Sequence, residues 1–264
     1  MSNCHNPFHE QDPSQPPTID RTLNLQELLQ STKQRYQDAG VPEWAQALPN
    51  TLTFPPDQLD LIKRELKEGA LPLLLPSSSI QLQTLVQALT RLKPLSINDT
   101  GSETVEDPYI WDDLRTLMAN QDPSLITNIP AAPYFVFTKP TQRLPEDTTQ
   151  KTLDQQKTHL ATLQRTHPKL DALQMAEYAA LQFHFTRDLQ ATQLRQGSAS
   201  LSTITPLDKD TWTSFPHLPV SRVGLAPSGD WYPDGRRLGF GRGGAVRADA
   251  LRGFRLAVRV ALKS

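Results

Sequence analysis

Several features that usually support a functional assignment are missing from this sequence. It contains a single cysteine, Cys4, so an internal disulfide framework and a cysteine-rich zinc site are both excluded. No HExxH motif, phosphate-binding loop or serine nucleophile elbow occurs. The longest strongly apolar stretch, Leu71–Leu75, is interrupted by Pro72 and is far too short to cross a bilayer. We therefore expect a protein without a membrane segment, a metal site or a cofactor.

The N-terminal residues are polar and carry no hydrophobic period. Residues 1–18 are rich in proline, asparagine and glutamine, which is typical of a disordered tail. They lack the apolar run of a secretory signal, so a cytoplasmic location is expected. Cys4, His5 and His9 are metal-binding residue types, but without a fourth partner we interpret them as part of the tail.

Charge and glycine are distributed unevenly along the chain. The formal net charge is −1, which gives no general basicity that would indicate nucleic acid or an anionic membrane. From Pro219 to Ser264, however, nine Lys and Arg stand against three Asp and Glu, a net charge of +6, and residues 1–218 carry −7. The same C-terminal segment holds eight of the twelve glycines. Composition therefore changes near residue 219.

Hydrophobic periodicity predicts an α+β protein. We expect an α-rich body with short strands over residues 19–196, followed by a β-rich Gly/Arg part over residues 197–264 that packs on the body. Apolar spacing, prolines and terminal glycines predict helices over residues 23–38, 55–68, 80–92, 108–120, 152–165 and 171–189. Short apolar runs predict strands over residues 70–75 and 134–137.

The order of these features resembles a known family over residues 30–245. The matching pieces are Arg35–Gly40, Phe54-Pro55, Leu71–Leu75, Pro133–Phe137 and the helix Leu170–Phe185. Together they resemble the bacterial domain-of-unknown-function family numbered 5701. That family has no assigned activity, so the resemblance implies a fold unit and a bacterial origin but no site residues.

The C-terminal segment shows turn and strand signals. Gly239–Gly244 has the GxGxxG spacing of a dinucleotide-binding loop, but too few residues follow for a βαβ unit, so we interpret it as a glycine-rich turn. Residues 254–262 alternate with period two, which predicts a half-buried strand with Arg255 and Arg259 on its open side. Pro233-Asp234-Gly235 predicts the turn of a hairpin.

Part of this segment also resembles the end of a second fold. The runs Arg242–Val246 and Gly253–Ala257 are similar to the closing strands of the formylglycine-generating-enzyme type of C-type-lectin fold. Val246 stands where that family has tryptophan, and the cysteines on which its chemistry depends are absent here. The resemblance therefore implies a non-catalytic relative that displays ligand-binding loops.

Three functional hypotheses follow from these patterns. The first is a non-catalytic recognition protein that binds a protein or an anionic ligand through exposed Trp231, Tyr232, Arg236, Arg237 and Arg242. Its structural alternative is that the arginines pair with the acidic body instead.

The second hypothesis is an enzyme, and the third is a nucleic-acid-binding protein. Glu177, His184 and Asp188 recur at helical spacing, and a histidine held by a carboxylate can act as a general base. Such a stripe is more often a satisfied structural pair. Binding of nucleic acid by the basic tail alone is the third possibility.

Overall fold

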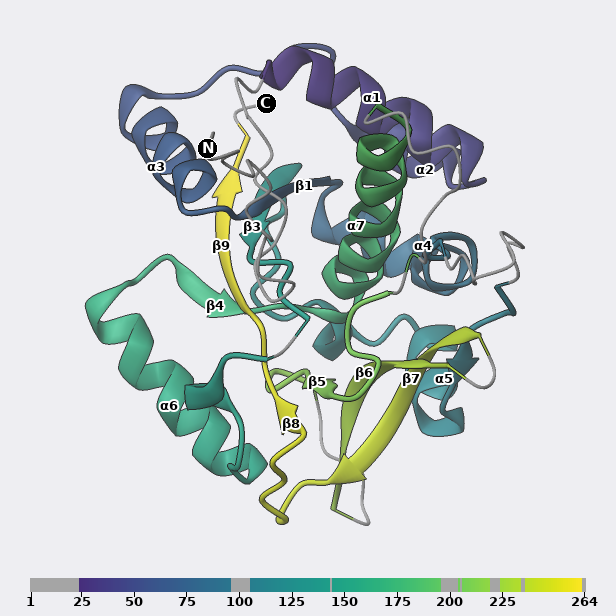
Figure 1. The fold of residues 1–264 in the computed structure, drawn as a ribbon, viewed down its shortest axis with the longest axis vertical. Coiled ribbons are helices and arrows are strands. Elements are labelled where there is room, and N and C mark those ends of the chain that lie inside the picture. The colour runs from purple at the N-terminus through teal and green to yellow at the C-terminus, as the bar shows by residue number, and fades with distance from the viewer. Residues whose placement is uncertain are drawn as a thin grey trace, which may run out of the picture.

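The computed structural model describes residues 24–95, 105–142, 144–195, 204, 206–218, 224–233 and 236–262. Within these ranges the chain forms seven α-helices and two sheets, so the predicted α+β class is confirmed (Figure 1). None of the helices described is long and apolar enough to span a membrane. The expected tail over residues 1–18, with Cys4, His5 and His9, lies outside the described residues.

The helices begin and end at the residues that the sequence marks. Asn24 caps the first helix by accepting hydrogen bonds from the amides of Gln26 and Glu27. Thr152 and Gln155 form a capping box at the start of the sixth. The helices are α1 (Leu25–Asp38), α2 (Pro42–Ala47), α3 (Pro56–Lys67), α4 (Ser78–Arg91), α5 (Asp112–Ala119), α6 (Leu153–Thr166) and α7 (Met175–Arg195). The sequence missed α2, because six residues are too few to show a helical period.

The last strand of the chain lies inside the first sheet. This four-stranded sheet has the order β1-β3-β9-β4, and all its pairings are antiparallel. Its strands are β1 (Leu71–Leu75), β3 (Tyr134–Thr138), β4 (Leu170–Ala172) and β9 (Leu256–Ala261). The predicted strands at residues 70–75, 134–137 and 254–262 are therefore confirmed. In Figure 1, β9 runs through the middle of the molecule.

The second sheet is built mainly from the C-terminal part. Its order is β2-β7-β6-β5-β8, and the long antiparallel hairpin of β6 and β7 is its largest pairing. Its strands are β2 (Tyr109–Ile110), β5 (Trp212–Ser214), β6 (Leu225–Tyr232), β7 (Arg237–Gly244) and β8 (Arg252–Gly253). The hairpin was predicted, although Asp234 and Gly235 of its turn lie outside the described residues. Strands from the C-terminal part thus complete both sheets.

Two predictions for the C-terminal strands were wrong. Gly239–Gly244 does not form a glycine-rich turn, because it runs as strand β7 paired with β6 along its length. Arg255 and Arg259 do not face solvent, because β9 is an interior strand and both of its sides are covered. Arg255 is 1% exposed and pairs with Asp208 at 2.6 Å.

Arg259 binds the helical body through three separate contacts. Its Nε and Nη2 atoms donate to the two carboxylate oxygens of Glu177 on α7, at 2.6 and 2.7 Å. Its Nη1 atom donates to Asp171 on β4 at 2.7 Å. Glu177 also accepts from the hydroxyl of Tyr134 on β3 at 2.9 Å. At Arg259 the structural alternative therefore holds: the arginine pairs with carboxylates of the body.

Removing the Arg259 guanidinium is expected to destabilise the fold strongly. Arg259→Met leaves the fully buried Glu177 without a cation, and such a loss costs about 3–5 kcal/mol in free energy of unfolding. The double variant Arg259→Met/Glu177→Gln removes the uncompensated charge and keeps an acceptor for Tyr134, so it should recover part of that loss. Urea denaturation followed by circular dichroism measures both variants. A cost below about 1 kcal/mol for the single variant would contradict this account.

Candidate functional site

Strand β7 carries glycine at three alternate positions, Gly239, Gly241 and Gly243. Because side chains alternate across a strand, these positions point to the same side of the five-stranded sheet. The other side of β7 carries Leu238 and Phe240, which are buried in the hydrophobic core. We call the side with the three glycines the glycine face.

A row of residues crosses the sheet on the glycine face. Gly239 pairs with Tyr109 of β2 on one side and with Asp230 of β6 on the other. The same antiparallel register brings Trp212 of β5 next to Asp230, and Trp212 pairs with Arg252 of β8. Paired residues share a face of the sheet. Aromatic, acidic and basic side chains therefore meet on this one surface.

Three exposed aromatic rings gather on this face. Among the described residues, the large aromatic side chains that are exposed are Tyr109, Trp212 and Tyr232, at 43%, 39% and 41%. All three belong to the second sheet, and Tyr232 follows Asp230 at a spacing of two residues. Exposed rings on one sheet face offer stacking surfaces for a ligand.

The three glycines have different surroundings. A Cβ at Gly239 would lie 2.4 Å from the ring of Tyr232, and a Cβ at Gly243 would lie within the guanidinium of Arg252. At Gly241, by contrast, no described atom lies within 4 Å of the position that a Cβ would take. We call this open space at the Cβ position of Gly241 the recess; Gly241 itself is buried.

One serine lies next to Gly241, and a second lies one strand further away. Gly241 pairs with Ser228 of β6, and Ser228 pairs with Ser214 of β5, so both serines share the glycine face. The Ser214 Oγ atom is buried and has no hydrogen-bond partner. Buried polar atoms are normally satisfied, so the Ser214 hydroxyl is an unused hydrogen-bonding group inside this part of the sheet.

Arg252 is only partly neutralised. Its guanidinium lies 5.4 Å from the ring centre of Trp212, and its Nη1 atom donates to the carbonyl of Gly244 at 2.7 Å. The carboxylate of Asp249 is 3.8 Å away, while the buried Nε atom has no partner. Burial lowers the pKa of Arg252. Arg252 is 7% exposed, and a buried guanidinium whose charge is only partly compensated favours an anionic partner.

Asp230 titrates far from its usual range. Burial, reinforced by the nearby carboxylate of Asp208, raises the pKa of Asp230 to about 7, although a hydrogen bond from Trp212 opposes the shift. Its Oδ1 atom would lie 2.5 Å from a Cβ at Gly239, so it stands directly over the glycine strand. Near neutral pH this carboxyl can therefore either donate or accept a hydrogen bond.

The structure separates the residues that the sequence grouped into a recognition surface. Trp231 is 3% exposed and packs in the core on the other side of β6, so its predicted exposure was wrong. Tyr232 is exposed as predicted. Arg236 is exposed at the end of the hairpin, with a positive φ of 44°. Arg237 is half-buried, 5.8 Å from the ring centre of Tyr109.

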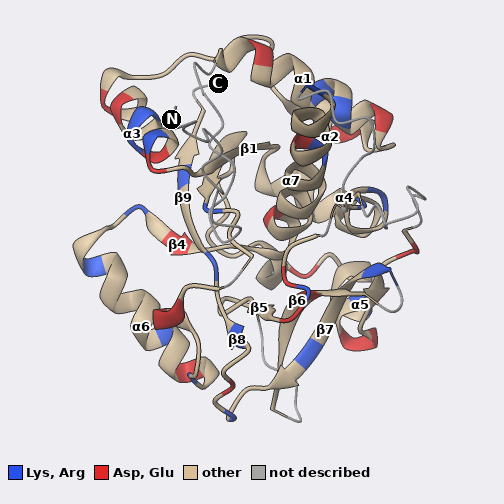
Figure 2. Cartoon of the chain, viewed as in Figure 1, with Lys and Arg blue, Asp and Glu red and all other residues tan. Residues whose placement is uncertain are grey.

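Arg242 is exposed, but it lies on the side of β7 opposite the glycines. Its guanidinium is 5.0 Å from the ring centre of Trp111. Figure 2 shows the basic residues recurring along β7, β8 and β9. Sequence reasoning missed six members of the glycine face, which come from four strands: Tyr109, Trp212, Ser214, Ser228, Asp230 and Arg252.

The proposed acid–base pair on α7 has a different role. His184 is 5% exposed, and its Nδ1 atom lies 3.1 Å from Arg35 of α1 rather than near a carboxylate. Burial and the charges of Arg35 and Arg187 hold the pKa of His184 well below its usual value. Asp188 pairs with Arg35 at 2.7 Å, and Glu177 pairs with Arg259. Among the described residues, no hydrogen bond joins Glu177 to His184.

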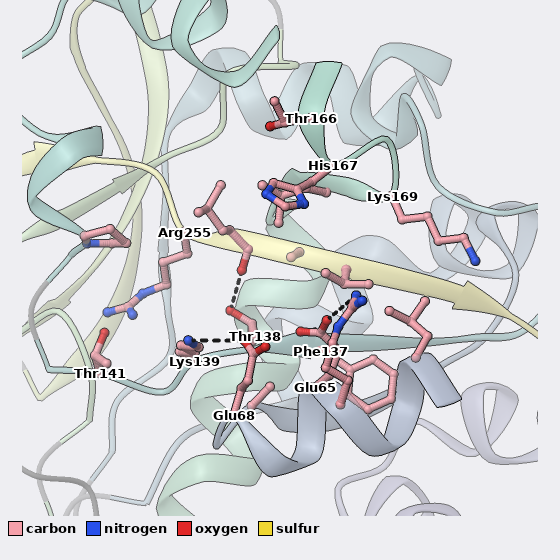
Figure 3. A pocket seen from close by; sticks show the side chains of 18 of the residues that line it. Glu65, Glu68, Phe137, Thr138, Lys139, Thr141, Thr166, His167, Lys169 and Arg255 are labelled. Atoms are coloured by element: carbon pink, nitrogen blue, oxygen red, sulfur yellow. Dashed lines mark hydrogen bonds and ion pairs between the residues drawn. The ribbon is translucent and has the colours of Figure 1, made fainter. Parts of the chain in front are cut away.

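A cleft of ≈ 1810 Å³ lies over the first sheet, between α3, the loop after β3 and the end of α6 (Figure 3). Phe137 and Val258 contribute to its apolar lining. The charges on its rim have both signs and pair across it, as Lys139 does with Glu68 at 3.7 Å. This pairing gives the cleft no preference for an anionic or a cationic ligand.

Comparison with known proteins gives no relative. No family model, curated protein or solved structure matches the chain. The two resemblances drawn from the sequence therefore stay predictions. Within the ranges that the structure describes, no group of three or more His, Cys, Asp or Glu side chains could hold a metal ion.

Alanine substitutions at two glycines of the hairpin should have very different effects on the free energy of unfolding. Gly229→Ala places a methyl group 2.5 Å from the ring of Tyr178 in the core and should destabilise the protein by about 1–3 kcal/mol. Gly241→Ala meets open space and should change the free energy of unfolding by less than about 0.5 kcal/mol. Thermal and urea unfolding test the pair. Equal losses at both positions would mean that no recess exists.

The raised pKa of Asp230 should make the stability of the protein depend on pH. Because folding raises its pKa, the folded state gains protons relative to the unfolded chain between about pH 4 and pH 7, so Asp230 lowers stability as pH rises through that window. Asp230→Asn should therefore gain about 1–4 kcal/mol relative to the native protein between pH 4 and pH 8. Urea titrations at both pH values measure this difference. A difference that does not change with pH would contradict the raised pKa.

Proposed function

We propose that this chain is a non-catalytic recognition protein that binds its ligand on the glycine face of the second sheet. The observation that carries the proposal is the recess at Gly241, flanked by an aromatic ring and a guanidinium. Glycine inside a strand weakens the strand, and it is used where a ligand approaches the backbone closely. The cytoplasmic location and bacterial origin expected from the sequence belong to the same proposal.

The groups on the glycine face are suited to holding a ligand. They are exposed rings, two serine hydroxyls, the guanidinium groups of Arg237 and Arg252, and one carboxyl group. The hydrogen-bonded histidine–carboxylate pairs lie elsewhere: His159 meets Asp147 beside α6, and His217 meets Asp171 next to β4. This distribution supports binding at the glycine face rather than acid–base catalysis there.

Ligand-observed NMR can test the proposal without a known ligand. The native protein is mixed with defined probes: glucose, galactose, the amino acids, benzoate, inorganic phosphate, AMP and GMP. We expect at least one probe to bind the native protein. Gly241→Val, which fills the recess, should abolish that binding while its unfolding midpoint stays close to that of the native protein.

Gly244→Ala is the matched control. It lies on the same strand but on the opposite face, where a Cβ would make only an ordinary contact, 3.7 Å from Arg247. This variant should bind as the native protein does. The proposal is wrong if every probe that binds does so equally well in Gly241→Val, because the binding site would then lie elsewhere, for example in the cleft over the first sheet.

A further inference from the structure

We infer that the cleft over the first sheet is a second binding site, and that its ligand is an elongated, uncharged apolar molecule of the long-chain alcohol type. This site is independent of the glycine face, which belongs to the second sheet. The inference is carried by an open cleft of ≈ 1810 Å³ whose floor is apolar and whose buried charged groups are already paired (Figure 3).

The floor of the cleft is a row of apolar side chains that crosses three strands. Val258 of β9 pairs with Phe137 of β3 on one side and with Leu170 of β4 on the other. Paired residues share a face of the sheet, and this face is opposite the one on which Arg259 meets α7. Leu256 precedes Val258 by two residues and lies on the same face. These side chains form a continuous apolar surface across the sheet.

The described part of the chain leaves the space above this floor open. Helix α3 forms one wall with Leu61, the loop after β3 forms a second wall with Leu144, and the turn between α6 and β4 forms a third. Leu170 and Leu256 are half-buried, so their side chains reach the open space. Small-molecule sites have volumes of about 300–1,000 Å³ and are lined mainly by apolar side chains. The cleft therefore has room for the whole of an extended apolar chain.

The charged groups inside the cleft already have partners. Glu65 of α3 is buried and accepts a hydrogen bond from Arg64 at 3.2 Å. Arg255 is buried as well and binds the carboxylate of Asp208 through two of its nitrogens. A charged ligand group placed beside them would lose its water without gaining a free partner of opposite charge. The interior of the cleft therefore disfavours a charged ligand.

The exposed charges at the rim nearly cancel one another. Lys139 pairs with Glu68 at 3.7 Å, and Asp60 pairs with Lys63 at 4.0 Å. In the described part of the chain, the lining residues without an ion pair are two acids, one lysine and one histidine: Asp57, Glu146, Lys169 and His167. All four are exposed, so solvent and salt screen their charges. Burial of an apolar chain is therefore the main source of affinity, and an uncharged hydroxyl head can stay in water at the rim.

Displacement of the uncharged fluorescent probe N-phenylnaphthylamine tests this inference. Straight-chain alcohols from hexanol to dodecanol compete with the probe for the native protein. Because burial of one methylene group strengthens binding about fourfold, the dissociation constant should fall about fourfold for each added carbon until the chain fills the cleft. Dodecanoate and dodecylamine, which carry charged heads, should bind no tighter than dodecanol.

Tryptophan substitutions locate the site. Leu61→Trp narrows the cleft from α3 and Leu170→Trp narrows it from β4, and each should weaken the binding of dodecanol at least about tenfold. Leu59→Trp is the matched control, because Leu59 lies on α3 outside the lining of the cleft, and this variant should bind as the native protein does. Unfolding midpoints from circular dichroism show which variants are folded, and either folded cleft variant is sufficient for the test.

The outcomes separate this site from the glycine face. Alcohols should bind Gly241→Val as they bind the native protein, because Gly241 belongs to the other sheet. If no alcohol binds, or if alcohols bind the folded cleft variants as well as they bind the native protein, the cleft is not a binding site. If affinity does not rise with chain length, or if either charged analogue binds at least about tenfold tighter than dodecanol, the inferred ligand class is wrong. None of these results changes the test of the glycine face.

Discussion

The ion pairs of Arg259 fix the position of the last strand, and the rest of the architecture depends on that position. A single guanidinium meets carboxylates from α7 and β4, and one of them also accepts the hydroxyl of Tyr134 on β3. The charges are buried, so each one is costly without its partners. This requirement favours one register of β9 over shifted registers, since sliding the strand by one residue would point Arg259 at the opposite side of the sheet.

A second arginine on the same strand segment connects the two sheets. Arg255 is four residues before Arg259 and binds Asp208 through two of its nitrogens, at 2.6 and 3.3 Å. The Asp208 carboxylate also accepts from the hydroxyls of Thr211 and Thr213, and its carbonyl accepts from the amide of Trp231. One buried residue, Asp208, therefore joins the segment just before β9 to strands β5 and β6. The raised pKa of Asp230 is a further consequence, because Asp208 is one of its causes.

The sequence was sufficient for local structure and insufficient for the arrangement of the strands. Prolines, terminal glycines and apolar periods predicted six helices, with ends correct to within about six residues, because those signals are local. The predicted start of the last helix was wrong, because Asp171 and Ala172 belong to strand β4. The alternation in residues 254–262 correctly indicated a strand, but it could not show that carboxylates 82 and 88 residues away would cover the arginine side. The exposure of Trp231 was predicted wrongly for a similar reason. The strand that contains it was predicted correctly, but which face of that strand is buried depends on residues far away in the sequence.

The glycine face shows what a sequence motif can and cannot indicate. The spacing of Gly239–Gly244 matched that of a dinucleotide-binding loop, yet the glycines lie in a strand, where an interior glycine lowers stability and has no side chain to pack. Gly239 and Gly243 are explained by the ring and the guanidinium that lie on them, whereas Gly241 has no such neighbour. Packing accounts for two of the three positions. At the third position no described side chain requires a glycine, and this is the position on which the proposed binding face rests.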